Sequence, residues 1–301
     1  MDDKKKILAI VNPISGTGKK DNIASVIEKF TDPQRVEVTL AVTERAGHAH
    51  EMAAQAASEG YDVVAAIGGD GTVNEVGCAL CGSDTALAVI PCGSGNGLAR
   101  HLRLPMSVSK SISLLNDGVV KKFDFCSVNG RPFFCTCGLG FDAQVSKAFA
   151  DADTRGLITY VKTTINEYFK YQPHEYRITI DGIEINEKAF VIACCNASQY
   201  GNNAFIAPRA SMQDGLIDMT IVHNINLLEA PLMGIKLFSR MLDQDHHVSV
   251  FRGSRITIER QEDDVIHIDG DPIEQPHRLE IECHHLGINI LVPKIEALKD
   301  L

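Results

Sequence analysis

The chain has 301 residues, which is enough for two domains that each enclose their own core. Its hydrophobic fraction of 45% is typical of a globular protein, and its net charge of −10 argues against nucleic acid as a partner, because surfaces that bind nucleic acid are basic. No apolar stretch approaches the ~20 residues of a membrane-spanning helix and no signal-peptide pattern follows Met1, so the sequence predicts a cytoplasmic protein whose membrane contacts, if any, are local and peripheral.

In the first third of the chain, four apolar strands each run into a loop of small residues and then a helix. The expected strands are 6–11, 36–42, 62–67 and 86–90, and the expected helices are 20–30, 47–58, 73–80 and 98–102. Alternating strands and helices are typical of a doubly wound, Rossmann-like α/β domain. In such a domain the ligand-binding loops gather at the carboxyl ends of the parallel strands.

The most informative loop follows the third strand and reads Gly68-Gly69-Asp70-Gly71-Thr72-Val73-Asn74-Glu75. Its glycines let the backbone approach a ligand, and the helix that follows, with Thr72 as its expected N-cap, presents N–H groups to a phosphate. Asp70 would repel a phosphate unless a cation such as Mg²⁺ lies between them. The alternative is a tight turn with a solvated aspartate, but the pattern favours a nucleotide phosphate site.

The loop after the first strand is a second candidate for phosphate contact. It reads Asn12-Pro13-Ile14-Ser15-Gly16 and continues into a glycine-rich turn. The spacing of its glycines and lysines differs from that of a P-loop, so the match to that motif fails. A glycine-rich turn with a polar edge before a helix remains.

From Phe123 onward short strands follow one another with turn residues between them. The expected strands are 131–137, 175–181, 188–195, 216–223, 254–259, 265–269 and 279–283, with two helices within 138–170 and a third over 227–242. This pattern predicts a mainly antiparallel β-sandwich. The expected domains are therefore 1–122, which binds nucleotide, and 123–301, which is β-rich and binds the substrate, with its last residues able to pack back on the first domain.

One pair of acids stands out in the second half of the chain. Asp269-Gly270-Asp271 follows a good apolar strand, and residues two apart in an extended chain point the same way. Two adjacent carboxylates on a turn suit a general base and a group that orients the acceptor. The alternative is a solvated acidic turn, which is the expected nature of nearby Asp263-Asp264.

The expected helix 227–242 carries Leu228, Leu232, Ile235, Phe238 and Leu242 close to one face. Either this face packs on the β domain, or its outer residues touch a bilayer. The nine cysteines fall mostly in apolar strands and include a single C-x-x-C, so the sequence favours buried, reduced thiols over a zinc site.

With these motifs in place, the chain resembles the bacterial diacylglycerol kinase family of soluble lipid kinases, relatives of the sphingosine kinases. The resemblance extends from the Asn12 loop through the central motif and Pro91-x-Gly93-Ser94-x-Asn96 to Asp269-Gly270-Asp271. It implies an ATP- and Mg²⁺-dependent kinase that transfers the γ-phosphoryl group to the hydroxyl of a lipid at a membrane surface.

The resemblance also implies roles for individual residues. ATP would contact Asn12, Pro13, Ile14, Ser15, Gly16, Thr43, Gly68, Gly69, Asp70, Gly71, Thr72, Val73, Asn74, Glu75 and Ser94. A structural Mg²⁺ would be held by the side chain of Asp214 and the carbonyls of Ser211 and Leu216, where a plain surface turn is the alternative. Asp70, Asp269 and Asp271 would be catalytic.

The acceptor stays open at this point. Gly97 is closer to the sphingosine kinase pattern, whereas Gln144 stands where sphingosine kinases carry an acid for the lipid amine. The competing functions are an NAD kinase, which shares the central motif, and a catalytically silent module that binds nucleotide or lipid. The oligomeric state is also open, with a homodimer as one option.

Overall fold

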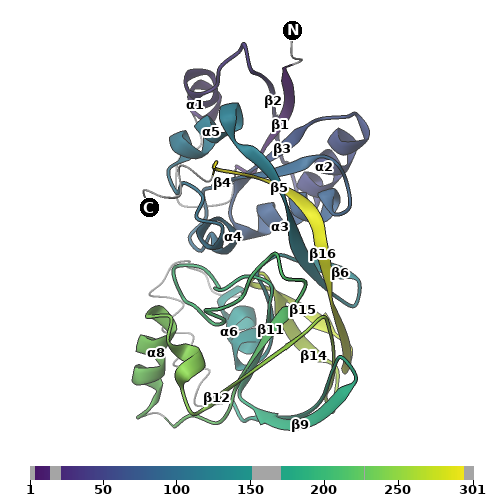
Figure 1. Cartoon of the computed structure of the whole chain (residues 1–301), viewed down its shortest axis with the longest axis vertical. Coiled ribbons are helices and arrows are strands. Elements are labelled where there is room, and N and C mark those ends of the chain that lie inside the picture. Colours follow the sequence, from purple (N-terminus) through teal and green to yellow (C-terminus); the bar gives the residue numbers. More distant parts are fainter. Residues whose placement is uncertain (1–3, 14–21, 151–170, 227, 295–301) are drawn as a thin grey trace. The chain divides into compact units, whose positions relative to one another are not determined.

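The protein is described by a computed structural model that covers residues 4–13, 22–150, 171–226 and 228–294 (Figure 1). These residues form two compact units. The first contains the described residues up to Phe123 together with those from Leu286 onward, and the second contains Asp124–His285. Two strands, β5 (Val119–Val128) and β16 (Arg278–Val292), contribute residues to both units.

The first unit is a parallel sheet with helices. Its strands are β1 (Lys5–Val11), β2 (Val36–Val42), β3 (Val63–Gly68) and β4 (Ala86–Pro91), and its described helices are α1 (Ile23–Phe30), α2 (His48–Ser58), α3 (Asp70–Leu80), α4 (Gly97–His101) and α5 (Val108–Asp117). The strand order is β2-β1-β3-β4, and the end of β16 adds to it where Ile290 pairs with Leu87 in parallel. The predicted Rossmann-like fold is confirmed.

The two central strands, β3 and β4, could be predicted from the sequence because they are buried. Every residue of β3 and of β4 is buried, so both strands are continuous apolar runs of the kind found inside parallel sheets. One detail differs from the prediction. Helix α3 begins at Asp70 with Gly69 as its N-cap, so Thr72 lies inside the first turn and does not cap the helix.

The second unit is an antiparallel β-sandwich, as predicted. Its strands besides β5 and β16 are β6 (Arg131–Phe133), β7 (Thr136–Gly140), β8 (His174–Ile180), β9 (Ile183–Ala189), β10 (Val191–Cys195), β11 (Ile217–Val222), β12 (Val248–Gly253), β13 (Arg255–Glu259), β14 (Asp264–Ile268) and β15 (Asp271–Gln275). One sheet has the order β12-β11-β10-β7-β14-β15, and the other joins β16, β13, β8 and β9.

The core of the sandwich draws on both sheets. Ile192 and Ile266 of the first sheet and Ile178 and Ile256 of the second belong to one cluster of fully buried side chains. Strands β8 and β13 alternate between buried and less buried residues, whereas β10 is buried throughout and β14 is buried after its first residue. On β8 and β13 the core therefore fixes which face points outward to solvent.

The predicted strand 131–137 is in fact two strands, β6 and β7. Between them the backbone N–H groups of Phe134 and Cys135 donate to the carboxylate of Asp269, so this short segment forms no ladder there. Helix α6 (Phe141–Ala150) is one of the two helices predicted within 138–170. The rest of that prediction lies outside the described residues.

The predicted helix 227–242 is shorter in the structure. Helix α8 covers Ala230–Phe238, and a separate 3₁₀ turn, η1, covers Leu242–Gln244. Arg240 has a φ of +61°, a left-handed conformation that no α-helix contains, and so it ends the helix. Among the described residues, no helix is both long and apolar enough to cross a bilayer.

The cysteines are free thiols, and five of the nine are buried. Burial raises the pKa of Cys194 to about 12, and it does the same for Cys81. Such thiols are poor nucleophiles and poor metal ligands at neutral pH. The prediction of reduced, mostly buried thiols agrees with this burial.

Candidate active site

The loops at the carboxyl ends of the first unit's strands lie against one another. The side-chain amide of Asn12, just after β1, donates to Thr72 Oγ1 at 3.2 Å. The N–H of Thr43, just after β2, donates to the carbonyl of Val11 at 2.9 Å, and Thr43 is buried. The residues predicted to contact ATP after β1, after β2 and at the start of α3 are therefore brought together.

Asp70 connects the central loop to the loop after β4. Its carboxylate accepts hydrogen bonds from the N–H groups of Asn96 and Gly97, at 2.8 and 2.7 Å. Asn96, with a φ of +51°, folds its side chain back on Gly93, accepting from its N–H at 2.9 Å and donating to its carbonyl at 2.7 Å. A single carboxylate thus positions the exposed loop that carries Ser94, a predicted nucleotide contact.

Two glycines make this arrangement sterically feasible. A Cβ atom on Gly93 would lie 2.6 Å from the Cα of Gly69, and a Cβ on Gly69 would lie 3.4 Å from the Cα of Gly93. Backbone atoms cannot move aside as a flexible side chain can. Without side chains at these two positions, the two backbones approach closely at the start of α3, and a helix N-terminus is a common binding site for phosphate.

We expect Gly93→Ala to raise the KM for ATP by ~10-fold or more, because the added methyl group would separate the two loops that are predicted to contact the phosphates. Gly234→Ala is the matched control, since a Cβ there meets nothing within 4 Å. Initial-rate kinetics over a range of ATP concentrations measure both variants. Equal KM values for Gly93→Ala and the parent protein would contradict the proposed phosphate contact.

Glu75, one of the predicted nucleotide contacts, is engaged in hydrogen bonds within the protein. The carboxylate of Glu75 accepts from the N–H groups of Gly47 and Ala49, at 3.0 and 3.2 Å, and so caps the N-terminus of α2. These contacts assign Glu75 a structural task. Among the other predicted contacts, Ile14, Ser15 and Gly16 lie outside the described residues.

The remaining predicted contacts follow each other along the central loop. Gly68 ends β3, and its carbonyl accepts from the N–H of Cys92 at 2.8 Å. Gly71, Val73 and Asn74 lie in the first turns of α3, and Val73 is buried. Pro13 is exposed.

The acidic pair of the second unit lies on a β-hairpin. Asp269 and Gly270, with φ values of +49° and +93°, form a two-residue turn, and Ile268 pairs with Asp271 across it. Positive φ at both turn residues is the type I′ geometry that Asp-Gly favours. The two acids therefore do not share one extended segment, as the sequence suggested.

The hairpin gives the two carboxylates different surroundings. That of Asp269 accepts from the N–H groups of Phe134, Cys135 and Thr136, at 3.0, 2.7 and 3.1 Å. Asp271 begins β15 and is exposed. Asp269 thus ties the hairpin to the segment between β6 and β7, and Asp271 is the acid that solvent or a substrate can reach.

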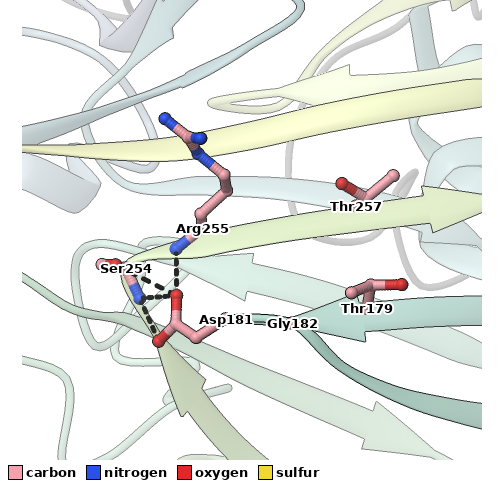
Figure 2. A pocket seen from close by; sticks show the side chains of 6 residues that line it. All are labelled: Thr179, Asp181, Gly182, Ser254, Arg255 and Thr257. Atoms are coloured by element: carbon pink, nitrogen blue, oxygen red, sulfur yellow. Dashed lines mark hydrogen bonds between the residues drawn. The ribbon is translucent and has the colours of Figure 1, made fainter.

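A second Asp-Gly turn in the same unit shows what such a carboxylate does structurally. Asp181 and Gly182, with φ values of +46° and +89°, join β8 to β9. Figure 2 shows the Asp181 carboxylate directed at the backbone nitrogens of Ser254 and Arg255, from which it accepts at 3.1 and 2.9 Å. These backbone hydrogen bonds lower the pKa of Asp181.

This second turn borders an open pocket. The pocket is lined by Thr179, Asp181, Gly182, Ser254, Arg255 and Thr257 (Figure 2). The guanidinium of Arg255 extends away from Asp181 and pairs with Glu282 at 2.9 Å. The residues predicted for catalysis or binding are not among those that line this pocket, so it offers no support for any of the predicted sites.

Three residues near the acidic hairpin were missed by the sequence analysis. The hydroxyl of Tyr200 donates to Asp142 Oδ2 at 2.8 Å, and His267 Nε2 lies 3.1 Å from the same oxygen. His267 is 2% exposed, and its Nδ1 has no hydrogen-bond partner among the described residues. His267 is the residue before the last one of β14. This buried network therefore fixes the end of the strand that leads to Asp269.

The predicted structural metal site was tested against the contacts of Asp214. Its carboxylate pairs with the guanidinium of Arg252, which also lies 3.1 Å from Asp218, and it accepts from the N–H of Leu216 at 3.2 Å. Burial raises the pKa of Asp218, and Arg252 opposes that rise. A guanidinium and a dication repel each other at one carboxylate, so the present contacts of Asp214 favour its pair with Arg252 over Mg²⁺.

We accordingly expect millimolar Mg²⁺ to leave the melting temperature of the protein unchanged. Asp214→Asn should lower the free energy of unfolding by about 1 kcal/mol, equally with and without Mg²⁺, because it weakens the pair with Arg252. Thermal unfolding followed by circular dichroism measures both effects. A rise in melting temperature with Mg²⁺ that Asp214→Asn abolishes would restore the metal assignment.

Comparison with known proteins identifies the families that share this architecture. A family model described as the diacylglycerol kinase catalytic domain matches residues 6–128, and one described as the YegS C-terminal NAD kinase beta sandwich-like domain matches residues 135–290. The fold is similar to a crystal structure of a diacylglycerol kinase from Bacillus anthracis str. Sterne, with a TM-score of 0.73 at 21% identity over 97% of this chain and 98% of that one. It is more distantly similar to an NAD kinase from Archaeoglobus fulgidus in complex with ATP, with a TM-score of 0.54 at 13% identity over 98% and 96%.

These matches define the class first: a two-domain kinase architecture of a parallel α/β unit followed by an antiparallel sandwich. At the level of sequence, the chain is 28% identical over 276 residues to a diacylglycerol kinase of Bacillus subtilis (strain 168), with 89% of this chain and 90% of the relative covered. The chain belongs to the diacylglycerol kinase family, whose members are lipid kinases, phosphotransferases with an alcohol group as acceptor.

Proposed function

We propose that the protein transfers the γ-phosphoryl group of ATP, with Mg²⁺, to the hydroxyl of a diacylglycerol-like lipid. The observation that carries this proposal is the contact between the Gly69 and Gly93 loops at the start of α3, locked by Asp70. Phosphoryl transfer depends chiefly on positioning and on neutralising charge, and this edge of the sheet supplies both.

Asp70 would supply an oxygen ligand to a nucleotide-bound Mg²⁺. Carboxylate oxygen is a ligand that Mg²⁺ prefers, and the Asp70 carboxylate already lies at the junction of the two loops, where it accepts from the N–H groups of Asn96 and Gly97. The ion would neutralise charge on the phosphates. The residues of this chain bind and orient: Asp70 holds the Ser94 loop, and the N–H groups of α3 face the phosphates.

For the acceptor hydroxyl we propose Asp271 as the general base. It is the exposed member of the acidic hairpin, whereas three backbone N–H groups occupy Asp269. The base must reach the hydroxyl and take its proton as the new O–P bond forms. Asp269 acts as a positioning residue, since it anchors the turn from which Asp271 extends.

An uncharged alcohol suits the acceptor better than an amine-bearing sphingoid base. Gln144 is neutral, and its amide nitrogen lies 3.3 Å from a carboxylate oxygen of Asp264, to which it donates. The relative in Bacillus subtilis is named a diacylglycerol kinase. The acceptor is therefore proposed to be diacylglycerol or a close analogue.

A transfer assay with radiolabelled ATP tests the function directly. Diacylglycerol, monoacylglycerol, sphingosine and NAD are offered separately, the lipids in mixed micelles, with and without Mg²⁺. We expect labelled phosphatidic acid, formed only with Mg²⁺. Labelled NADP in place of labelled lipid would show an NAD kinase, and the absence of any labelled product would favour a silent binding module.

Helix α8 is the proposed contact with the membrane that carries the acceptor. None of its residues is buried, and Leu232, Ile235 and Phe238 are 54%, 65% and 54% exposed. Apolar side chains exposed side by side on one helix are a common signature of a surface that meets lipid. Leu242, which the sequence analysis grouped with them, is 1% exposed and belongs to the core.

We expect the double variant Ile235→Ser, Phe238→Ser to bind vesicles that contain diacylglycerol about 10-fold more weakly, because two apolar insertions are lost. Ile183→Ser is the control, since Ile183 is 71% exposed and lies at the turn between β8 and β9. Sedimentation with vesicles measures the affinity. Unaltered binding of the double variant would mean that α8 is not the contact.

A further inference from the structure

Metal-ligand side chains with no role in the proposed reaction gather beside α8. Glu229, His246 and His247 each offer one ligand atom, and these atoms lie within 4.8 Å of one another. Glu229 immediately precedes α8, while the two histidines lie between η1 and β12. Two segments of the chain are thus needed to form the cluster.

The spacing within the cluster matches a metal coordination sphere. Glu229 Oε2 lies 3.4 Å from His247 Nε2. Two ligands at about 2.0–2.1 Å from a tetrahedral Zn²⁺ are separated by about 3.4 Å. The rings of His246 and His247 have their centroids 3.9 Å apart, so the second imidazole lies beside the first.

The buried acid Asp245 fixes the proton on His247. Its Oδ1 lies 3.1 Å from His247 Nδ1 and accepts from the backbone N–H of the same residue at 2.9 Å. A carboxylate only accepts hydrogen bonds, so the tautomer with its proton on Nδ1 suits Asp245 and offers the lone pair of Nε2 to a cation on the side of Glu229. A carboxylate behind a histidine in this manner is the usual partner of a metal-bound imidazole.

The charges around the cluster also suit a cation. Asp245 is 7% exposed, and its other oxygen pairs with Lys236 Nζ at 2.7 Å, so the ammonium is held by that oxygen. Glu229 contributes a further negative charge, and its side chain is 39% exposed. Imidazole ligands favour Zn²⁺ and related transition metals over Mg²⁺ or Ca²⁺.

We propose that Glu229, His246 and His247 form a binding site for a transition-metal ion of the Zn²⁺ class, with water as the fourth ligand. The ion would join the residue before α8 to the segment before β12. No residue of α8 is fully buried, although Met233 and Leu237 pack against the core, and such a link would add a further tie to this helix. The site is independent of the kinase activity, so its failure would leave the proposed function untouched.

The test is calorimetric titration of the reduced, chelator-treated protein with Zn²⁺, with Mg²⁺ as the control cation. We expect one Zn²⁺ per chain and no heat from Mg²⁺ at this site. His246→Ala should weaken Zn²⁺ binding by at least ~10-fold, and Glu229→Gln should do so as well. The side chain of His246 is 79% exposed, so its removal leaves the fold intact.

The matched control is His277→Ala. His277 Nδ1 lies 3.1 Å from Asp263 on the surface, which makes a histidine–carboxylate pair that is not one of the three-ligand clusters among the described residues. This variant should bind Zn²⁺ as the parent does. Substitution with Co²⁺ identifies the ligands, because thiolates give an intense near-ultraviolet band that nitrogen and oxygen ligands lack. Zn²⁺ binding that survives in His246→Ala, a thiolate band, or no binding at all would each overturn the proposal.

Discussion

Asp271→Asn is expected to lower kcat by ~10²-fold or more while the unfolding midpoint of the protein stays unchanged. The substitution removes the basic carboxylate and keeps the size of the side chain. Because Asp271 is exposed at the start of β15, its replacement leaves the contacts of Asp269 intact. The KM for ATP should change little, since the base acts on the acceptor hydroxyl.

Asp269→Asn should behave differently, because this carboxylate accepts three backbone hydrogen bonds. An amide cannot accept all of them, and we expect the free energy of unfolding to fall by about 2 kcal/mol. Asp181→Asn is the matched control: the same turn type and the same capping of backbone N–H groups, followed by Ile183 in place of an acid.

The pair of variants separates structure from chemistry. Asp181→Asn should lose stability and keep its specific activity, and Asp269→Asn should lose stability and part of its kcat. Chemical denaturation and steady-state kinetics on the same preparations provide both numbers. If Asp271→Asn phosphorylates lipid at the parent rate, Asp271 is not the base.

Asp70→Asn is expected to abolish nearly all turnover, with kcat reduced by ~10²-fold or more at saturating Mg²⁺. The amide would turn an NH₂ group toward the N–H of Asn96 or of Gly97, where the carboxylate now accepts. The loop that carries Ser94 would lose its anchor. The nucleotide-bound metal would lose a negatively charged ligand in the same step.

Glu75→Gln distinguishes these effects from a general loss of stability. Glu75 lies on the same helix and also accepts two backbone hydrogen bonds, those that begin α2. Both variants should lower the free energy of unfolding by about 1–2 kcal/mol, and only Asp70→Asn should lose turnover. Parent activity in Asp70→Asn at saturating Mg²⁺ would show that its carboxylate is purely structural.

The fold was predictable where burial dictates composition. Strand β2 was predicted over 36–42 and is found there, and the fully buried strands β3 and β4 stand out as apolar runs between small-residue loops. The sandwich was predictable from strand density alone. Strand β16 was recognised only over 279–283, because its middle residues, Glu282 to His285, include polar side chains that interrupt the pattern.

The candidate site was predictable to the level of residues but not of roles. Local motifs located Asp70 and Asp269, yet the partners of Asp70 lie 26 and 27 positions away and those of Asp269 lie 133 to 135 away. No local pattern encodes such pairs. The hairpin turn at Asp269-Gly270 could have been predicted, because Asp-Gly between two strands is a strong hairpin signal. The sequence analysis gave more weight to the two acids as a pair.

The network of Asp142, Tyr200 and His267 left no sequence signal at all. A single histidine in an apolar strand is usually a core residue, and its partners come from a helix and a loop distant in sequence. The same holds for Glu229 and His247, which lie on separate segments. Clusters whose residues come from distant segments can be identified only in the three-dimensional structure.

The division of β16 between the two units has a consequence for biosynthesis. Leu291, near the end of β16, is 1% exposed in the core of the first unit, and Ile290 pairs with Leu87 of β4. The second unit, Asp124–His285, is one continuous segment and can fold as soon as it emerges. Strands β1 to β4 are therefore synthesised well before their partner segment in β16, and the edge of β4 stays open until that segment emerges. A nascent chain would acquire its sandwich before its parallel sheet closes, and a stalled chain would present the unpaired edge of β4 to chaperones.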